Sequence, residues 1–280
     1  MNRQGFIDFN TRLSPENSGK ADSYARAIQI LDEVLPYQDI LNLHGQSLYN
    51  ITDAAFIDEV LHIVNDELRK MKAGQQNIFD HGNPNQKSYP LKSFCSAALK
   101  SLKNYAQYEQ DIQKADMIVA QETNPQTIST KLINHFDITK EGEDVASETK
   151  RRKGQDYFRH MILVNYGGRC ALTGINIREL LLASHIIPWA DKTHKKDRLN
   201  PCNGICLSAL YDRAFDKGLI TISPDDYTVR LSSALREYET QEYYDRHFGN
   251  VSGQKIAMPT EYYPNRDFLA YHRDNVFVGS

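Results

Sequence analysis

The sequence predicts an α+β protein, with an all-helical N-terminal region followed by a region of short strands and helices. Across residues 20–110 of the 280-residue chain, apolar residues recur every three or four positions, as in amphipathic helices. Between residues 181 and 218 the pattern changes to strand, loop, strand and helix. The stretch 111–155 between them is polar and heavily charged, which is typical of a linker or a loosely packed connection.

The N-terminal helices have recognisable ends and apolar faces. Apolar residues recur at helical spacing in residues 20–35, 53–71 and 91–108. The second of these predicted helices also begins with a favourable N-cap residue, Asp53. Residues 78–90 are rich in Asn, Gly and Pro and predict a loop. We therefore expect a helical domain over residues 1–148 and a second domain over residues 149–280.

The second domain is expected to alternate between short elements. Its helix over 155–167 should end at Gly167, and its strand over 181–189 should stop at Pro188. A helix over 208–218 has Ser208 as its N-cap. The other expected elements are strands over 169–174, 219–223 and 227–232, a polar loop over 190–204, and helices near 236–247 and 265–273.

The charge is unevenly distributed, although the net charge is only -3. Residues 1–149 contain 14 basic and 21 acidic residues, whereas residues 150–200 contain eleven basic and four acidic ones. Because local fields attract a phosphate backbone, the second segment could contact nucleic acid. A solvated basic face is the alternative interpretation.

Other features narrow the class of protein. The sequence has no run of about 18 apolar residues and no signal-peptide-like start, so we expect a cytoplasmic protein without a membrane partner. Its four cysteines, Cys95, Cys170, Cys202 and Cys206, form no CxxC pair. We therefore expect neither a structural zinc site nor a disulfide framework, and we interpret the cysteines as small core residues.

A group of polar residues in the second domain could hydrolyse a phosphodiester. His185 lies in the predicted apolar strand, and a neutral imidazole can take a proton from water. Asp212 and Asp216 are four residues apart on a predicted helix and share a face, as ligands of a magnesium-type ion could. Taken singly, each has a plainer explanation: a satisfied histidine, or an aspartate that caps the helix end.

Residues 158–224 resemble the HNH nucleases of the ββα-metal class. The elements that carry this resemblance occur in the family's order: Cys170–Gly174, Ser184–Ile186, Pro188–Trp189, Asn200–Pro201, Asn203–Gly204 and Phe215–Gly218. The resemblance implies that His185 is the general base, that Asn203 ties down the loop and helps to orient it, and that Asp212 and Asp216 bind one divalent metal ion. Mg²⁺ is the expected ion, with Mn²⁺ or Ni²⁺ as alternatives, and no other cofactor is expected.

Two residues depart from the family pattern. Ser184 stands where many members carry an Asp or His metal ligand, and Tyr211 stands where members of this branch often carry His. Tyr211 could contact a DNA phosphate or pack in the core. The remaining residues expected to contact DNA are basic: Arg151, Arg152, Lys153, Lys192, Lys195, Lys196 and Arg198.

The expected function is a metal-dependent DNA endonuclease of restriction or anti-phage defence. Two alternatives stay open: a catalytically decayed HNH protein that binds DNA, and an RNA-cleaving HNH nuclease. The N-terminal helices resemble, weakly, segments that precede HNH modules in bacterial restriction proteins. They could form a homodimer, regulate the nuclease or read DNA.

Overall fold

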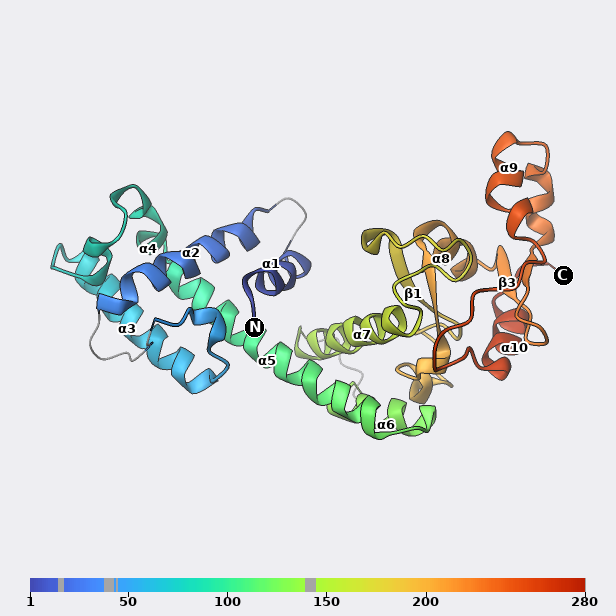
Figure 1. The fold of residues 1–280 in the computed structure, drawn as a ribbon, viewed down its shortest axis with the longest axis horizontal. Helices are drawn as coiled ribbons and strands as arrows, with labels where there is room; N and C mark the ends of the chain where they lie inside the picture. Colours follow the sequence, from blue (N-terminus) through green and yellow to red (C-terminus); the bar gives the residue numbers. More distant parts are fainter. Residues whose placement is uncertain (15–17, 38–42, 44, 139–144, 280) are drawn as a thin grey trace. The chain divides into compact units, whose positions relative to one another are not determined.

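The chain divides into two compact units, Met1–Gln113 and Lys114–Ser280. The computed structural model describes residues 1–14, 18–37, 43, 45–138 and 145–279 (Figure 1). Every helix within these ranges is too short or too polar to cross a membrane. The first unit is helical and the second combines helices with two small sheets, so the predicted α+β class is confirmed.

The first unit is built from helices whose apolar faces share one core. They are α1 (Arg3–Arg12), α2 (Lys20–Val34), α3 (Ala54–Lys72), α4 (Ser88–Leu91) and the beginning of α5 (Phe94–Gln121). As expected, α3 begins where the Asp53 carboxylate accepts a hydrogen bond from the Ala55 amide. Its residues Val60, Val64 and Leu68 lie on one stripe and are buried in the core.

The stretch 111–155 is largely helical, and its prediction as a linker was wrong. α5 continues to Gln121, α6 (Pro125–His135) follows, and α7 (Val145–Asn165) begins within the stretch. Asn124 caps α6, and Ile128 and Leu132 give that helix a buried stripe that the polar composition obscures. Residues 139–144 of the expected linker lie outside the described residues.

The packing of α6 explains why the residues around it belong to the second unit. α6 contacts the segment Lys195–Asp197, in which the Lys196 carbonyl accepts a hydrogen bond from the Ser129 hydroxyl at 2.7 Å. Residues 114–138 therefore group with the second unit. The boundary between the two units follows Gln113, which is N-terminal to the domain boundary that we expected between residues 148 and 149.

The second unit contains two antiparallel hairpins with helices around them. Its elements after α7 are β1 (Leu181–His185), β2 (Gly204–Ser208), α8 (Ala209–Asp216), β3 (Ile220–Ile222), β4 (Val229–Leu231), α9 (Glu242–His247) and α10 (Arg266–Asn275). β1 and β2 followed by α8 form a ββα unit. The expected strand over 169–174 is instead a turn, in which the Gly174 amide donates to the Cys170 carbonyl at 2.9 Å.

Gly204 lets α7 approach the first hairpin closely. A Cβ atom added at Gly204 would lie 2.5 Å from the nearest Ile162 side-chain atom and 2.7 Å from Phe158, both on α7. Such distances are below those of real Cβ contacts, so any larger residue here would displace Ile162 and Phe158, although the backbone at Gly204 is extended. β1 is therefore flanked by α7 and by α8, which contacts both strands (Figure 1).

Candidate active site

The hairpin places two consecutive residues of β1 against different helices. In the antiparallel register, Ser184 lies opposite Ile205 and His185 opposite Gly204. Successive side chains of a strand point to opposite faces. The Ser184 side chain accordingly meets α8, where its hydroxyl donates to Asp212 Oδ1 at 2.6 Å. The His185 ring stacks on Phe158 of α7, with ring centroids 3.9 Å apart.

His185 is held as a neutral imidazole with a defined proton position. Its Nε2 lies 2.9 Å from the carbonyl oxygen of Arg198. Since a carbonyl only accepts, Nε2 carries the proton and Nδ1 keeps its lone pair. Within the described residues His185 makes no other side-chain hydrogen bond. Burial lowers the pKa of His185 to about 4, against the opposing effect of that hydrogen bond, so Nδ1 is unprotonated at neutral pH.

Asn203 closes the loop that connects the two strands. Its side chain is 1% exposed. Nδ2 donates to the carbonyl oxygens of Ile187 and Asp197 at 3.3 and 3.1 Å, and Oδ1 accepts from the Ile187 amide at 2.8 Å. The asparagine thus fixes the chain just after His185 to the chain just before Arg198, whose carbonyl holds the imidazole. These bonds are those of a residue that ties down the loop.

α8 presents two carboxylates one helical turn apart. Tyr211, Ala214 and Phe215 are buried, while Asp212 is partly exposed and Asp216 is exposed. Partial desolvation raises the pKa of Asp216, and the neighbouring Asp212 carboxylate raises it further. Their mutual repulsion would be relieved by a bound cation.

The comparison with known families agrees with this ββα arrangement. Residues 170–223 match the family model described as HNH endonuclease. The chain contains an HNH module. The predicted resemblance is thereby confirmed for this part of the chain. No curated protein matches the chain.

The HNH module offers oxygen donors for a metal ion. HNH nucleases in general use a divalent metal. In the described part of the chain, no three His, Cys, Asp or Glu side chains gather in one group that could hold a metal. Asp212 and Asp216 supply two carboxylates, and Mg²⁺ is often bound by one or two carboxylates together with water and substrate phosphate. The two carboxylates therefore fit a divalent metal ion that would take its other ligands from water and phosphate.

A loop organised by Asp191 displays the lysines expected to contact DNA. Asp191 Oδ1 accepts from the backbone amides of Thr193 and His194 at 2.8 and 2.9 Å, and Oδ2 accepts from the Tyr271 hydroxyl of α10 at 2.6 Å. These bonds, led by that from Tyr271, hold the pKa of Asp191 well below its usual range. The lysines that the loop exposes are Lys192, Lys195 and Lys196.

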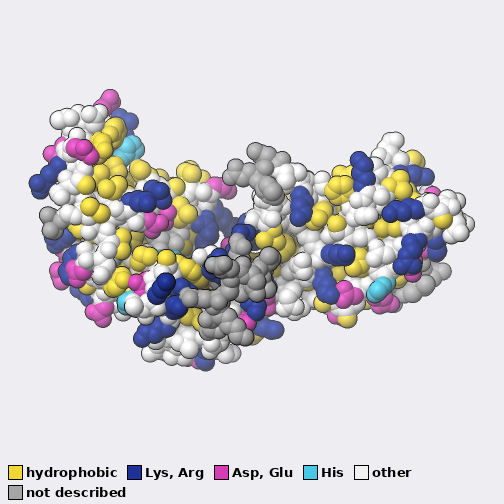
Figure 2. Space-filling model, turned by 180° about the vertical axis from the view of Figure 1, so that it is seen from behind, with side chains coloured by type: hydrophobic (Ala, Val, Ile, Leu, Met, Phe, Trp, Pro, Cys, Tyr) yellow, Lys and Arg dark blue, Asp and Glu magenta, His cyan; other side chains and the backbone are white. Residues whose placement is uncertain are grey.

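The other residues expected to contact DNA have different surroundings. Arg151 and Arg152 are exposed and Lys153 is partly buried, all on α7. Arg198 donates through Nε to the Trp189 carbonyl at 2.9 Å and lies over the Trp189 ring. On the face seen in Figure 2, lysines and arginines are interspersed with acidic and hydrophobic side chains.

Tyr211 packs in the core, so its prediction as a DNA contact was wrong. The side chain is 4% exposed, and its hydroxyl donates to the His247 carbonyl at 2.6 Å. The ring meets Phe248 edge to face. The alternative role, packing in the core, is the one that the structure shows for Tyr211.

α10 supports the HNH module through residues that no sequence pattern indicated. His272 is buried, stacks on Phe215 at 3.7 Å, and lies with Nε2 3.1 Å from the Phe215 carbonyl oxygen. Its Nδ1 lies 2.9 Å from the Thr221 hydroxyl. Burial lowers the pKa of His272 to about 4. The histidine thus joins the end of α8 to β3, and no short motif signals such a long-range contact.

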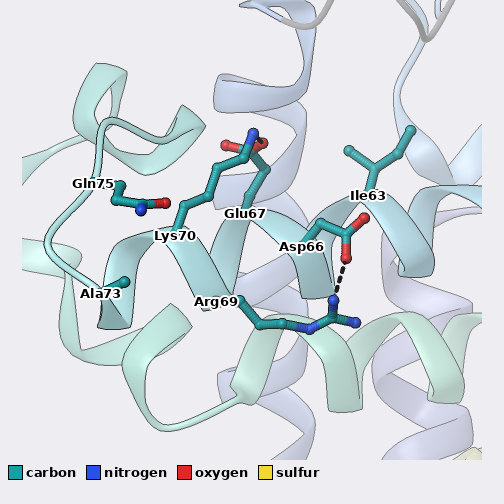
Figure 3. A pocket seen from close by; sticks show the side chains of 7 residues that line it. All are labelled: Ile63, Asp66, Glu67, Arg69, Lys70, Ala73 and Gln75. Atoms are coloured by element: carbon teal, nitrogen blue, oxygen red, sulfur yellow. Dashed lines mark hydrogen bonds and ion pairs between the residues drawn. The ribbon is translucent and has the colours of Figure 1, made fainter.

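A hollow in the first unit has no comparable chemistry. It lies along α3, where the side chains of Asp66 and Arg69 pair at 2.9 Å (Figure 3). Lys70 and Glu67 pair with each other as well, and Glu67 also accepts from the Ile78 amide at 2.8 Å. Because these charges neutralise one another and hold α3 to the next turn, we interpret the hollow as structural.

Proposed function

We propose that this protein is a metal-dependent endonuclease that hydrolyses DNA phosphodiester bonds. The observation that carries the proposal is the tautomer of His185. Its Nε2–H is committed to the Arg198 carbonyl, so Nδ1 is the nitrogen that can take a proton. This base lies next in sequence to Ser184, whose hydroxyl is bonded to Asp212 on the helix that carries both carboxylates.

In the proposed reaction, His185 Nδ1 removes a proton from the water that attacks the scissile phosphate. The bond from phosphorus to the leaving oxygen breaks as the new bond forms, and the leaving oxygen takes a proton from solvent. The imidazolium that forms keeps its Nε2–H bond to the Arg198 carbonyl, which holds the ring in place and favours the positive charge. Asn203 fixes that carbonyl through the loop. A divalent ion held by Asp212 and Asp216 would neutralise charge that develops on the phosphate.

The exposed basic residues would hold the DNA backbone on either side of the cut. Lys192, Lys195 and Lys196 are displayed by a loop that is fixed through Asp191 and Ser129. Arg151 and Arg152 on α7 are a second exposed group. Contacts of this kind give affinity and register without reading bases.

The test is cleavage of supercoiled plasmid by the purified protein with Mg²⁺ or Mn²⁺, and with EDTA as control. We expect metal-dependent nicking that is lost in His185→Ala, and that Tyr166→Phe, a change of a buried tyrosine in the same unit, leaves intact. A matched RNA substrate is expected to survive. Cleavage of RNA in preference to DNA would instead favour the RNA nuclease.

A second candidate is a DNA-binding protein that has lost catalysis. The observation that favours it is Ser184, which stands where family members often have a further metal ligand. The remaining candidate ligands are the two carboxylates of α8. Retained DNA binding without cleavage across metals, and with equal behaviour of His185→Ala, would establish this candidate. The setting in restriction or anti-phage defence, the cytoplasmic location and the role of the N-terminal helices remain predictions.

A further inference from the structure

Ser184 is one of the two residues of the HNH module that depart from the family pattern. Its side chain is 2% exposed, and its hydroxyl lies 2.6 Å from Asp212 Oδ1. This bond is short and charge-assisted, because the acceptor is a carboxylate. A serine there is therefore more than an absent ligand: it has a defined partner on α8.

The bond divides the two oxygens of Asp212 between two tasks. Oδ1 accepts from Ser184, and among the described residues the Asp212 side chain makes no other hydrogen bond. Oδ2 is thus the oxygen left for a cation. A carboxylate fixed in this way loses little rotamer freedom when an ion binds, which favours binding through one oxygen.

Because the Ser184 hydroxyl is neutral, it also limits the negative charge that gathers around Asp212 and Asp216. Asp212 and Asp216 lie one turn apart, and the Asp212 carboxylate disfavours the negative charge of Asp216. A third carboxylate at position 184 would add to that repulsion, whereas a neutral donor reduces it. β1 further couples this arrangement to the base, because Ser184 and His185 are consecutive residues that contact α8 and α7.

We propose that Ser184 is a positioning residue of the metal site: it donates to Asp212, presents Oδ2 to a divalent ion, and is not itself a ligand. The inference rests on the proposed function, since it presumes that Asp212 and Asp216 bind the ion. It predicts a site with two protein carboxylates that depends on a buried hydroxyl for its affinity.

The test measures metal binding directly, without DNA and without turnover. Mn²⁺ is titrated into the full-length protein, and free Mn²⁺ is followed by electron paramagnetic resonance. We expect Ser184→Ala to weaken Mn²⁺ binding by about 10- to 100-fold, the usual effect of losing a hydrogen bond to a ligand. Ser208→Ala is the matched control: Ser208 is also buried on this hairpin but makes no side-chain capping bond to α8. It should leave Mn²⁺ binding unchanged.

The outcomes separate this inference from the proposed function. If Asp212→Ala abolishes Mn²⁺ binding but Ser184→Ala does not weaken it, the positioning role is refuted and the metal site stands. If Asp212→Ala and Asp216→Ala both bind Mn²⁺ like the parent protein, the proposed metal site itself fails.

Ser184→Cys distinguishes positioning from direct ligation and keeps a side chain with a hydrogen-bond donor at this position if Ser184→Ala does not fold. A thiol is a weak donor, so we expect weaker Mn²⁺ binding and no gain in Cd²⁺ binding. A gain in Cd²⁺ affinity would mean that position 184 faces the ion as a ligand, because thiolates favour soft metals, and would overturn the inference. Circular dichroism confirms that each variant is folded.

Discussion

Replacing Gly204 by alanine tests whether close packing of α7 against the hairpin supports the site. The added Cβ atom would meet Ile162 at 2.5 and 2.6 Å and Phe158 at 2.7 Å. Overpacking of a well-packed core costs about 1–3 kcal/mol. For a unit of this size, each kcal/mol lowers the melting temperature by about 2–4 °C.

The same substitution should lower activity more than stability alone explains. Phe158 stacks on His185 with ring planes 14° apart, so a shift of Phe158 moves the imidazole from its bond to Arg198. Under saturating DNA and metal, we expect a reduced kcat in the folded fraction. Ile162→Val removes the atom nearest to the new Cβ, and it should restore part of both losses in the double variant.

Thermal melts by circular dichroism and plasmid nicking measure the two effects. Gly154→Ala on α7 is the control, since its Cβ would make only ordinary contacts at 3.4 Å or more and an alanine favours a helix by roughly 0.5–1 kcal/mol. We expect this control to be neutral or stabilising. A Gly204→Ala protein that melts and cleaves like the parent, or a double variant with no recovery, would refute the packing argument.

Two further predictions concern pH and salt. Burial holds the pKa values of His185 and His272 near 4, below the ordinary 6.5, so their neutral forms stabilise the fold above pH 6.5 and that contribution is lost as pH falls towards 4. Melting temperatures across this range should fall with pH, and less steeply in His272→Gln; parallel profiles would contradict the assignment. Lys195→Ala and Lys196→Ala should each reduce the slope of log binding constant against log salt by about 1 for any DNA sequence, as measured by fluorescence anisotropy. An unchanged slope would remove the lysine in question from the DNA surface.

The sequence predicted those parts of the site that depend on local spacing. The four-residue interval of Asp212 and Asp216 places both on one face of α8, and β1 begins at Leu181 as the pattern indicated, although it ends at His185 and not at Pro188. Asp53 begins α3 for the same reason: a cap and an apolar stripe are properties of consecutive residues. The HNH resemblance was confirmed over residues 170–223.

Contacts between distant residues could not be predicted in this way. The bond from Ser184 to Asp212 joins residues 28 positions apart, and that from Tyr271 to Asp191 joins residues 80 apart. Tyr211 was assigned to the wrong surroundings because its helix position does not reveal that residues after α8 cover it. α6 was missed since its buried stripe is short and lies in a polar stretch.

The support of His185 has a practical consequence for transferring this HNH module into other proteins. The family match begins at residue 170, yet Phe158 lies under the imidazole and is earlier in the chain. The match ends at residue 223, yet Tyr271 and His272 hold the lysine loop and the end of α8 from beyond it. A segment limited to residues 170–223 would contain every residue of the family motif, but it would lack the side chains that hold those residues in place. Ser129 of α6 also bonds to the lysine loop, so the smallest segment that could be transferred with its supports extends from α6 through α10.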